Sequence, residues 1–181
     1  VGGGYIGMEL GTVYAAFGSK VVLVEALNSI LMGADPDLAR PIMAYAKKAF
    51  REVRVGTKVM KMVTKGKQVK VVMEYGGKSL EELYDGVLVS VGRLPNCEDL
   101  GLKNTKITFD EKGFVKVNEK QETSDPSIWA IGDVVGGAML AHKAAKEARI
   151  AVESLEGEES VFRDITIPAV VFTDPELAWC G

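Results

Sequence analysis

The chain has 181 residues, a formal net charge of −3 and a pI near 5.4. This mildly acidic balance argues against a surface for nucleic acid or an anionic membrane, and no apolar run approaches the roughly 18 residues needed to cross a bilayer. With 47% hydrophobic residues and a mean hydropathy of +0.09, the composition is that of a globular protein with a buried core.

The first residues carry the most informative motif of the chain. Gly2, Gly4 and Gly7 have the spacing G-x-G-x-x-G, which in a strand-to-helix turn cradles a dinucleotide pyrophosphate. Gly2 would permit the tight turn, Gly4 the approach of the phosphates, and Gly7 the close packing of helix on sheet. The pyrophosphate would sit on free N–H groups at the helix N-terminus. Because the motif should follow a complete strand and only Val1 precedes it, we expect an excerpt of a longer polypeptide.

The segment after the glycines predicts a helix and then a strand. Helically spaced apolar residues precede a glycine and a short apolar run, namely Ile6, Leu10, Val13, Tyr14, Phe17, Gly18 and residues 21–24. The run ends in Glu25, at about the 20-residue distance from the first glycine where an acidic side chain meets a ribose 2′-OH. The alternative is a surface glycine loop with an unrelated Glu25.

Residues 38–91 predict a second helix, a hairpin and a buried strand. The helix covers residues 38–50, with Pro41 in or near its first turn. Residues 58–63 and 68–75 form the hairpin, and the apolar run 87–91 is typical of a strand buried on both faces of a parallel sheet. This order predicts an α/β fold: a doubly wound, Rossmann-like nucleotide-binding domain with a β-meander in place of one helical crossover.

Lysines and cysteines have plainer interpretations. The lysines between Lys58 and Lys70 alternate with Val and Met, which favours solvated hairpin faces over a phosphate-binding site. Cys97 and Cys180 form neither a C-x-x-C motif nor a zinc spacing. We therefore expect two unpaired cysteines without chemistry and no metal site.

Beyond residue 96 the pattern changes to short strands and one helix. Residues 107–109 and 114–117 predict a hairpin, and residues 127–131 a short strand. Residues 139–155 predict a helix and residues 169–172 a further strand. We expect a central α+β segment followed by the first strand of another domain.

Three positions in the second half could contact a ligand. Gly92 directly follows the run 87–91, at the edge where open α/β sheets bind ligands. Asp133 follows a strand and a glycine, so its carboxylate could hold a sugar or polyol hydroxyl, or merely cap the turn. His142 is the single histidine and could be a general base, but no Ser, Cys or carboxylate stands at an interpretable spacing.

Together these motifs resemble the pyridine-nucleotide-disulfide oxidoreductase family, over essentially the whole chain. Its members are FAD- and NAD(P)-dependent. The resemblance implies an NAD-binding domain over residues 1–96, a central domain completing the FAD site over 97–165, and the start of a dimer-interface domain over 166–181. Residues 139–144 and 172–179 are most similar to members that oxidise dihydrolipoyl groups and pass hydride to NAD. Members of the glutathione reductase, NADH oxidase or transhydrogenase type and a non-catalytic NAD-binding module remain alternatives.

The resemblance also implies which residues bind NAD. The glycine loop and helix start would wrap the pyrophosphate and approach the nicotinamide, through Gly2, Gly3, Gly4, Tyr5, Ile6, Gly7, Met8 and Glu9. Glu25 would hold both adenosine ribose hydroxyls, and its charge would repel the 2′-phosphate of NADP. Val59 would contact the adenine, and Gly92 would approach NAD through its backbone.

For FAD, the resemblance implies that Asp133 holds the ribityl hydroxyl. Met139, Leu140, Ala141 and His142 would line the isoalloxazine, which makes His142 a flavin neighbour and not the catalytic base. The redox-active cysteines, the first FAD glycine loop and the acid/base histidine–glutamate pair would all lie outside this chain. We therefore expect no catalytic residue within residues 1–181.

The resemblance finally implies partners and a location. The partner would be a lipoyl-bearing acyltransferase of a 2-oxoacid dehydrogenase complex or the glycine cleavage system, and the whole protein would form a homodimer. Neither nucleic acid nor membrane is expected as a partner. The protein would be cytoplasmic, or would lie in the mitochondrial matrix of a eukaryote.

Overall fold

The computed structural model describes residues 1–163 and 165–180. Contacts divide them into two compact units, each with its own internal packing. The first unit contains residues 1–92 and 170–179, and the second contains residues 93–169 and Cys180.

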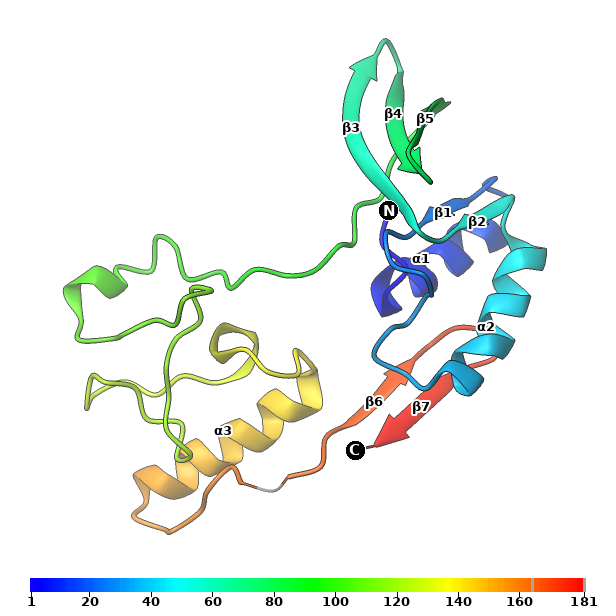
Figure 1. The fold of residues 1–181 in the computed structure, drawn as a ribbon. Helices are drawn as coiled ribbons and strands as arrows, with labels where there is room; N and C mark the ends of the chain where they lie inside the picture. Colours follow the sequence, from blue (N-terminus) through cyan, green and yellow to red (C-terminus); the bar gives the residue numbers. More distant parts are fainter. Residues whose placement is uncertain (164, 181) are drawn as a thin grey trace. The chain divides into compact units, whose positions relative to one another are not determined.

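The first unit begins with a helix and a βαβ element (Figure 1). Its elements are α1 (Tyr5–Ala16), β1 (Val22–Val24), α2 (Pro36–Ala49) and β2 (Glu52–Arg54). β1 and β2 pair in parallel, with Leu23 opposite Val53. A parallel pair needs a crossover connection, and α2 provides it. This arrangement confirms the predicted α/β class.

The core of the first unit lies between the two helices and β1. Met8 of α1 and Ile42 of α2 are each 1% exposed, and Leu23 of β1 is 3% exposed. α2 buries Ala39, Ile42 and Ala46, whose spacing places them on one face of a helix. The helical period therefore identifies the buried face of α2. The apolar face predicted for α1 is wrong, because α1 buries Gly7, Met8 and Gly11 instead, while residues of the predicted face are exposed: Leu10 (38%), Val13 (46%), Tyr14 (51%) and Phe17 (84%).

The predicted position of Pro41 is wrong. α2 begins at Pro36, so Pro41 lies inside the helix rather than in its first turn. Pro36 already occupies the start, where a missing N–H is tolerated. Pro41 has no N–H to donate to the carbonyl of Asp37 one turn earlier. The packed apolar face of α2 maintains the helix across this gap.

A three-stranded antiparallel meander follows, as predicted. It contains β3 (Thr57–Lys65), β4 (Gln68–Tyr75) and β5 (Lys78–Tyr84), in that spatial order. Val71 and Met73 of β4 are buried and pack against Val24 of β1. Most of the lysines of the β3–β4 hairpin are exposed, in agreement with solvated hairpin faces.

The prediction of a doubly buried strand over residues 87–91 is wrong. Val89 is 52% and Val91 is 71% exposed, and no strand is formed there. The backbone of the segment makes two hydrogen bonds, both to Val1: the Val1 ammonium donates to the Leu88 carbonyl at 2.7 Å, and Ser90 N–H donates to the Val1 carbonyl at 2.8 Å. The Ser90 hydroxyl also donates to the Val1 and Gly2 carbonyls, at 3.0 and 3.5 Å. Pairing with one residue does not build a ladder or cover the valine side chains.

The second unit contains less regular structure than predicted. Its elements are η1 (Leu102–Asn104), η2 (Gly132–Val135) and α3 (Ala141–Leu155). The strands predicted over 107–109, 114–117 and 127–131 are reduced to single antiparallel bridges, Phe109–Val115 and Glu122–Trp129. The helix is confirmed, although it begins two residues later than predicted.

The last strands are β6 (Pro168–Val171) and β7 (Leu177–Cys180), which form a two-stranded sheet. The strand predicted over 169–172 is thus confirmed. In the part of the chain that the structure describes, no helix is both long and apolar enough to span a membrane.

Candidate functional site

The three glycines of the motif have different surroundings. A Cβ on Gly2, whose φ is +101°, would lie 2.2 Å from the Ser90 carbonyl oxygen, and one on Gly7 would lie 1.9 Å from the Gly2 carbonyl oxygen. A Cβ on Gly4 would have no heavy atom of the described residues within 4 Å. Packing therefore requires Gly2 and Gly7, while Gly4 borders open space through which a ligand can approach the backbone.

The start of α1 presents free hydrogen-bond donors beside Gly4. Gly4 is the N-cap residue and makes no side-chain cap. Met8 N–H donates to the Gly4 carbonyl at 3.0 Å, so the N–H groups of Tyr5, Ile6 and Gly7 precede the first bonded turn. These donors and the positive end of the helix dipole suit an anion such as a pyrophosphate.

Glu25 is anchored against the same loop. Its Oε2 accepts a hydrogen bond from Gly3 N–H at 2.6 Å, and its Oε1 accepts one from Leu27 N–H at 2.7 Å. Its backbone continues the pairing beyond β1, because Glu25 N–H donates to the Arg54 carbonyl at 2.8 Å. An ionised carboxylate has about four acceptor positions, so two remain for hydroxyl groups of a ligand.

The other residues predicted for NAD differ in how they are presented. The Met8 side chain is in the core, so only its backbone could face a ligand. Glu9 Oε1 accepts a hydrogen bond from Phe172 N–H at 2.8 Å. Val59 is half-buried against the Val24, Val71 and Met73 cluster, next to an irregularity in β3. Gly92 has a φ of +136° and open space at its Cβ position, which leaves its backbone accessible.

In the second unit, Asp133 lies in η2 and forms an ion pair that the sequence analysis missed. Its Oδ2 is 2.7 Å from Arg93 Nη2, and Arg93 Nη1 donates to the Met139 carbonyl at 3.5 Å. The side chains of Arg93 and Asp133 are 45% and 40% exposed. Arg93 therefore connects Asp133 to the segment 139–142. The one indication in the sequence was that Arg93 directly follows Gly92, which was predicted to lie at a ligand-binding edge.

His142 lies in the first turn of α3, and its Nε2 contacts the Pro168 carbonyl oxygen. A carbonyl can only accept, so Nε2 is the donor. This contact favours the tautomer with the proton on Nε2 when the ring is neutral. In that tautomer Nε2 donates and cannot accept a proton, and Nδ1 is the unprotonated ring nitrogen.

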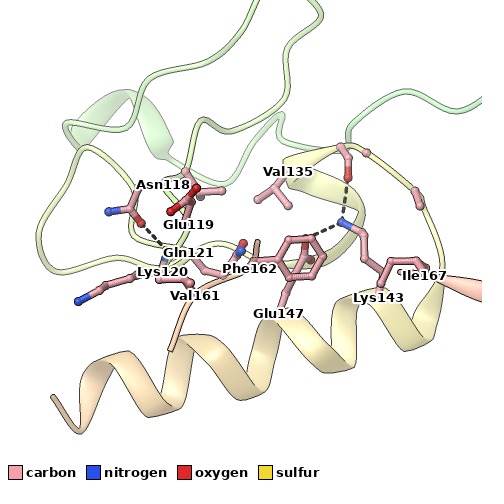
Figure 2. A pocket seen from close by; sticks show the side chains of 14 residues that line it. Asn118, Glu119, Lys120, Gln121, Val135, Lys143, Glu147, Val161, Phe162 and Ile167 are labelled. Carbon is pink, nitrogen blue, oxygen red and sulfur yellow. Dashed lines mark hydrogen bonds and ion pairs between the residues drawn. The ribbon is translucent and has the colours of Figure 1, made fainter. Parts of the chain in front are cut away.

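A buried ion pair fixes the turn that carries Asp133 (Figure 2). Lys143 and Glu147 of α3 are 3% and 4% exposed and lie 2.8 Å apart. Lys143 Nζ also donates to the carbonyls of Gly136 and Gly132, at 2.8 and 3.3 Å. Glu147 Oε2 accepts from Gly132 N–H at 2.7 Å. The three ammonium donors are thus used, and the pair holds η2 against α3.

Beside this pair is a pocket of about 710 Å³, whose walls include Phe162, Val135 and Gln121. Asp133 and Met139–His142 do not line it, so it is distinct from the predicted flavin contacts. Gln121 Oε1 is buried there without a hydrogen-bond partner among the described residues. No group of His, Cys, Asp and Glu residues in the described ranges could hold a metal ion.

A glycine loop at a helix start, with a carboxylate held beside it, is typical of proteins that bind dinucleotides. Comparison with known families identifies the class. A family model described as pyridine nucleotide-disulphide oxidoreductase matches residues 1–148, and the chain belongs to this family. Such flavoprotein disulfide reductases use FAD and NAD(H). The family resemblance seen in the sequence is confirmed.

The relatives include dihydrolipoyl dehydrogenases. The protein of Buchnera aphidicola subsp. Schizaphis graminum is 40% identical over 184 residues, and that of Geobacillus stearothermophilus is 42% identical over 181 residues. Each alignment covers 100% of this chain and 38% of the relative. The chain thus spans about two fifths of the length of these curated relatives.

Solved structures agree with this placement. The HOCl-induced flavoprotein disulfide reductase RclA from Escherichia coli has a TM-score of 0.88 and 31% identity, covering 100% of this chain and 41% of that chain. LpdA from Mycobacterium tuberculosis has a TM-score of 0.85 and 29% identity, covering 98% of this chain and 38% of that chain. The predicted Rossmann-like α/β fold is consistent with these neighbours.

Proposed function

We propose that this chain is the cofactor-binding part of a dihydrolipoyl dehydrogenase. The observation that carries the proposal is the glycine loop, in which Gly4 faces open space while Glu25 is held against Gly3. The open space at Gly4 suits the phosphates of a dinucleotide, and the carboxylate of Glu25 suits its adenosine ribose. When bound, NAD and FAD supply the hydride transfer, and the chain supplies orientation and charge.

For NAD, the N–H groups at the start of α1 bind the pyrophosphate, together with Gly2, Gly3 and Gly4. Glu25 accepts hydrogen bonds from both adenosine ribose hydroxyls with the lone pairs that Gly3 and Leu27 leave free. A 2′-phosphate would meet the same carboxylate, and the repulsion favours NAD over NADP. Val59 contacts the adenine, and Gly92 approaches through its backbone.

For FAD, Asp133 accepts a hydrogen bond from the ribityl chain, and residues 139–142 line the isoalloxazine. The N–H groups at the start of α3 face the pyrimidine oxygen, where negative charge collects on reduction. His142 is a neighbour of the flavin in this proposal. The domains run over residues 1–96 for NAD, 97–165 for the central domain and 166–181 for the start of the interface domain.

The whole protein oxidises dihydrolipoyl groups and transfers hydride to NAD. Its partner is a lipoyl-bearing acyltransferase of a 2-oxoacid dehydrogenase complex or the glycine cleavage system, and it works as a homodimer in the cytoplasm. The bacterial dihydrolipoyl dehydrogenases that align with the whole chain support this proposal. The similarity to RclA favours a second candidate, another flavoprotein disulfide reductase. Dihydrolipoamide-dependent NADH formation by the whole protein separates the two.

The experiment is a calorimetric titration of the protein with NADH and NADPH. We expect tighter binding of NADH, and a loss of roughly 1–3 kcal/mol for NADH in Glu25→Ala, because charge-assisted hydrogen bonds disappear. Glu25→Gln keeps an acceptor but removes the charge, so it should narrow the preference for NADH over NADPH. Glu74→Ala, at an exposed position of β4, is the matched control. Equal or tighter binding of NADPH to the unmodified protein would contradict the proposal.

A further inference from the structure

We infer that the pocket beside the Lys143–Glu147 pair is a separate small-molecule site, which binds an uncharged molecule with a flat apolar ring and one N–H or O–H donor. The pocket has a volume of about 710 Å³, within the range of about 300–1,000 Å³ that is typical of small-molecule sites. The described residues that line it all belong to the second unit, and Asp133 and residues 139–142 are not among them. The inference therefore concerns a site apart from the proposed cofactor contacts.

Gln121 gives this pocket a hydrogen-bond acceptor that the fold does not use. The residue is 3% exposed, and its Oε1 is buried without a hydrogen-bond partner among the described residues. Buried polar atoms of side chains are in large majority paired, because an unpaired one costs free energy in the folded protein. A ligand that donates an N–H or O–H group to Oε1 removes this cost. The unpaired acceptor therefore calls for a donor on the ligand.

The backbone fixes the position of Gln121. Its φ is +64°, in the left-handed region that residues other than glycine seldom adopt. Its N–H donates to the Asn118 carbonyl at 3.0 Å, and its carbonyl accepts from Ala130 N–H at 3.1 Å. The Asn118 side chain also accepts from the N–H groups of Lys120 and Glu122, at 2.9 and 3.0 Å. These contacts hold the turn, so the acceptor is in place before a ligand arrives.

The other walls of the pocket favour an apolar molecule without charge. Phe162 offers an aromatic ring, and Figure 2 shows this ring and the Gln121 side chain among the groups around the pocket. The charged side chains of the wall each have a partner of opposite charge: Lys143 with Glu147, Glu119 with Arg163, and Lys120 with Glu159. An ionic ligand would thus lose its water without gaining a free counter-charge. An uncharged ring avoids this loss and can pack against Phe162.

Calorimetric titration of the purified protein tests the inference, with 2-naphthol, 2-methoxynaphthalene and 2-naphthoate as probes. The three share one apolar ring system, and only 2-naphthol is both uncharged and able to donate a hydrogen bond. We expect 2-naphthol to bind roughly 10-fold more tightly than either of the others, because it alone pairs with the buried acceptor at no cost in charge. Saturating FAD should leave its affinity unchanged, since the pocket is apart from the proposed flavin contacts.

Two variants locate the site. Gln121→Met keeps the length of the side chain but removes its carbonyl, so it should abolish the preference for 2-naphthol over 2-methoxynaphthalene. Val161→Trp places a large ring in the wall of the pocket and should weaken the binding of 2-naphthol. The control is Gln68→Met on β4, the same change in the other unit, which should leave all three affinities unchanged.

Thermal unfolding checks that each variant remains folded. Four results would each overturn the inference: no binding of 2-naphthol, equal binding of 2-methoxynaphthalene, displacement of 2-naphthol by FAD, and unchanged binding of 2-naphthol in folded Gln121→Met or Val161→Trp protein. None of them bears on the glycine loop, so the proposed function is tested separately.

Discussion

Gly4 and Gly7 belong to one loop, yet they should respond in opposite ways to one added methyl group. In Gly7→Ala the new Cβ would lie 1.9 Å from the Gly2 carbonyl oxygen and 2.8 Å from Ser90 Oγ. In Gly4→Ala it would have no heavy atom of the described chain within 4 Å, and the backbone there (φ −74°, ψ −178°) is open to any residue. One substitution thus affects folding, and the other affects the ligand.

The distances set the size of each effect. Real Cβ atoms do not approach other heavy atoms within 3.0 Å, so Gly7→Ala must move backbone by about 1 Å. We expect a loss of about 3 kcal/mol or more in unfolding free energy, at or above the upper range for overpacking. In Gly4→Ala, an N-cap loss of about 0.5–1 kcal/mol is offset by about 0.4–1 kcal/mol from a less flexible unfolded chain. The net change in stability should be near zero.

Gly4→Ala, which should leave the stability nearly unchanged, should weaken the binding of NADH. The methyl group of Gly4→Ala fills the space beside the free N–H groups of α1, so we expect the affinity for NADH to fall about 10-fold or more, equivalent to at least 1.4 kcal/mol. Urea denaturation and fluorescence titration measure the two quantities. Gly33→Ala is the control and should change neither quantity, because its added Cβ would also have no heavy atom of the described chain within 4 Å. A Gly4→Ala protein that binds NADH normally, or unfolds as readily as Gly7→Ala, would refute the assignment of the loop.

Three further predictions concern the turn, the pH dependence and the flavin contact. Lys143→Met leaves the buried Glu147 carboxylate without its cation and should lower the unfolding free energy, measured in urea, by about 3–5 kcal/mol. Adding Glu147→Leu should recover part of that loss, and an unchanged stability of Lys143→Met would contradict the prediction. Burial, and after it the hydrogen bond to Glu82, raises the pKa of Tyr84 to about 12. The protonated Tyr84 side chain therefore contributes fully to the unfolding free energy below pH ~10, and this contribution declines as the pH rises to ~12. Denaturation at pH 9–12 should show a shallower decline in Tyr84→Phe. His142→Gln should change flavin affinity more than the pH profile of turnover; turnover reduced by orders of magnitude with flavin retained would make His142 the base.

Local patterns predicted the parts of the first unit that depend on neighbouring residues. The glycine spacing and the helical period placed α1, and the run ending at Glu25 placed β1 beside the loop. The β3–β4 hairpin was visible because alternating residues flank a glycine-containing turn at Gly66. Each of these elements is specified by residues close together in the chain.

Elements that depend on distant partners were not predictable in the same way. The run 87–91 has the composition of a buried strand, but a strand forms only where neighbouring strands offer several donors and acceptors, and here Val1 alone does so. The run 127–131 likewise forms one bridge, at Trp129. An apolar run indicates that its side chains favour burial, but it does not indicate which other segments will pair with it.

The missed site residues have the same cause. Lys143 and Glu147 are four residues apart on α3, a spacing that usually indicates an exposed ion pair. They are buried because the turn at Gly132 and Gly136 lies across them and supplies backbone partners to both charges. Both glycines make these contacts through backbone groups, which leave no side-chain pattern in the sequence from which the contacts could be predicted.

The carboxylates proposed to bind the cofactors share one arrangement. Glu25 accepts two backbone N–H groups and Asp133 accepts a guanidinium, so each carboxylate is oriented before a ligand arrives. A carboxylate so held loses less conformational entropy on binding than a free one and keeps lone pairs for a hydroxyl. It follows that removing a partner such as Arg93 weakens binding even where it makes no ligand contact.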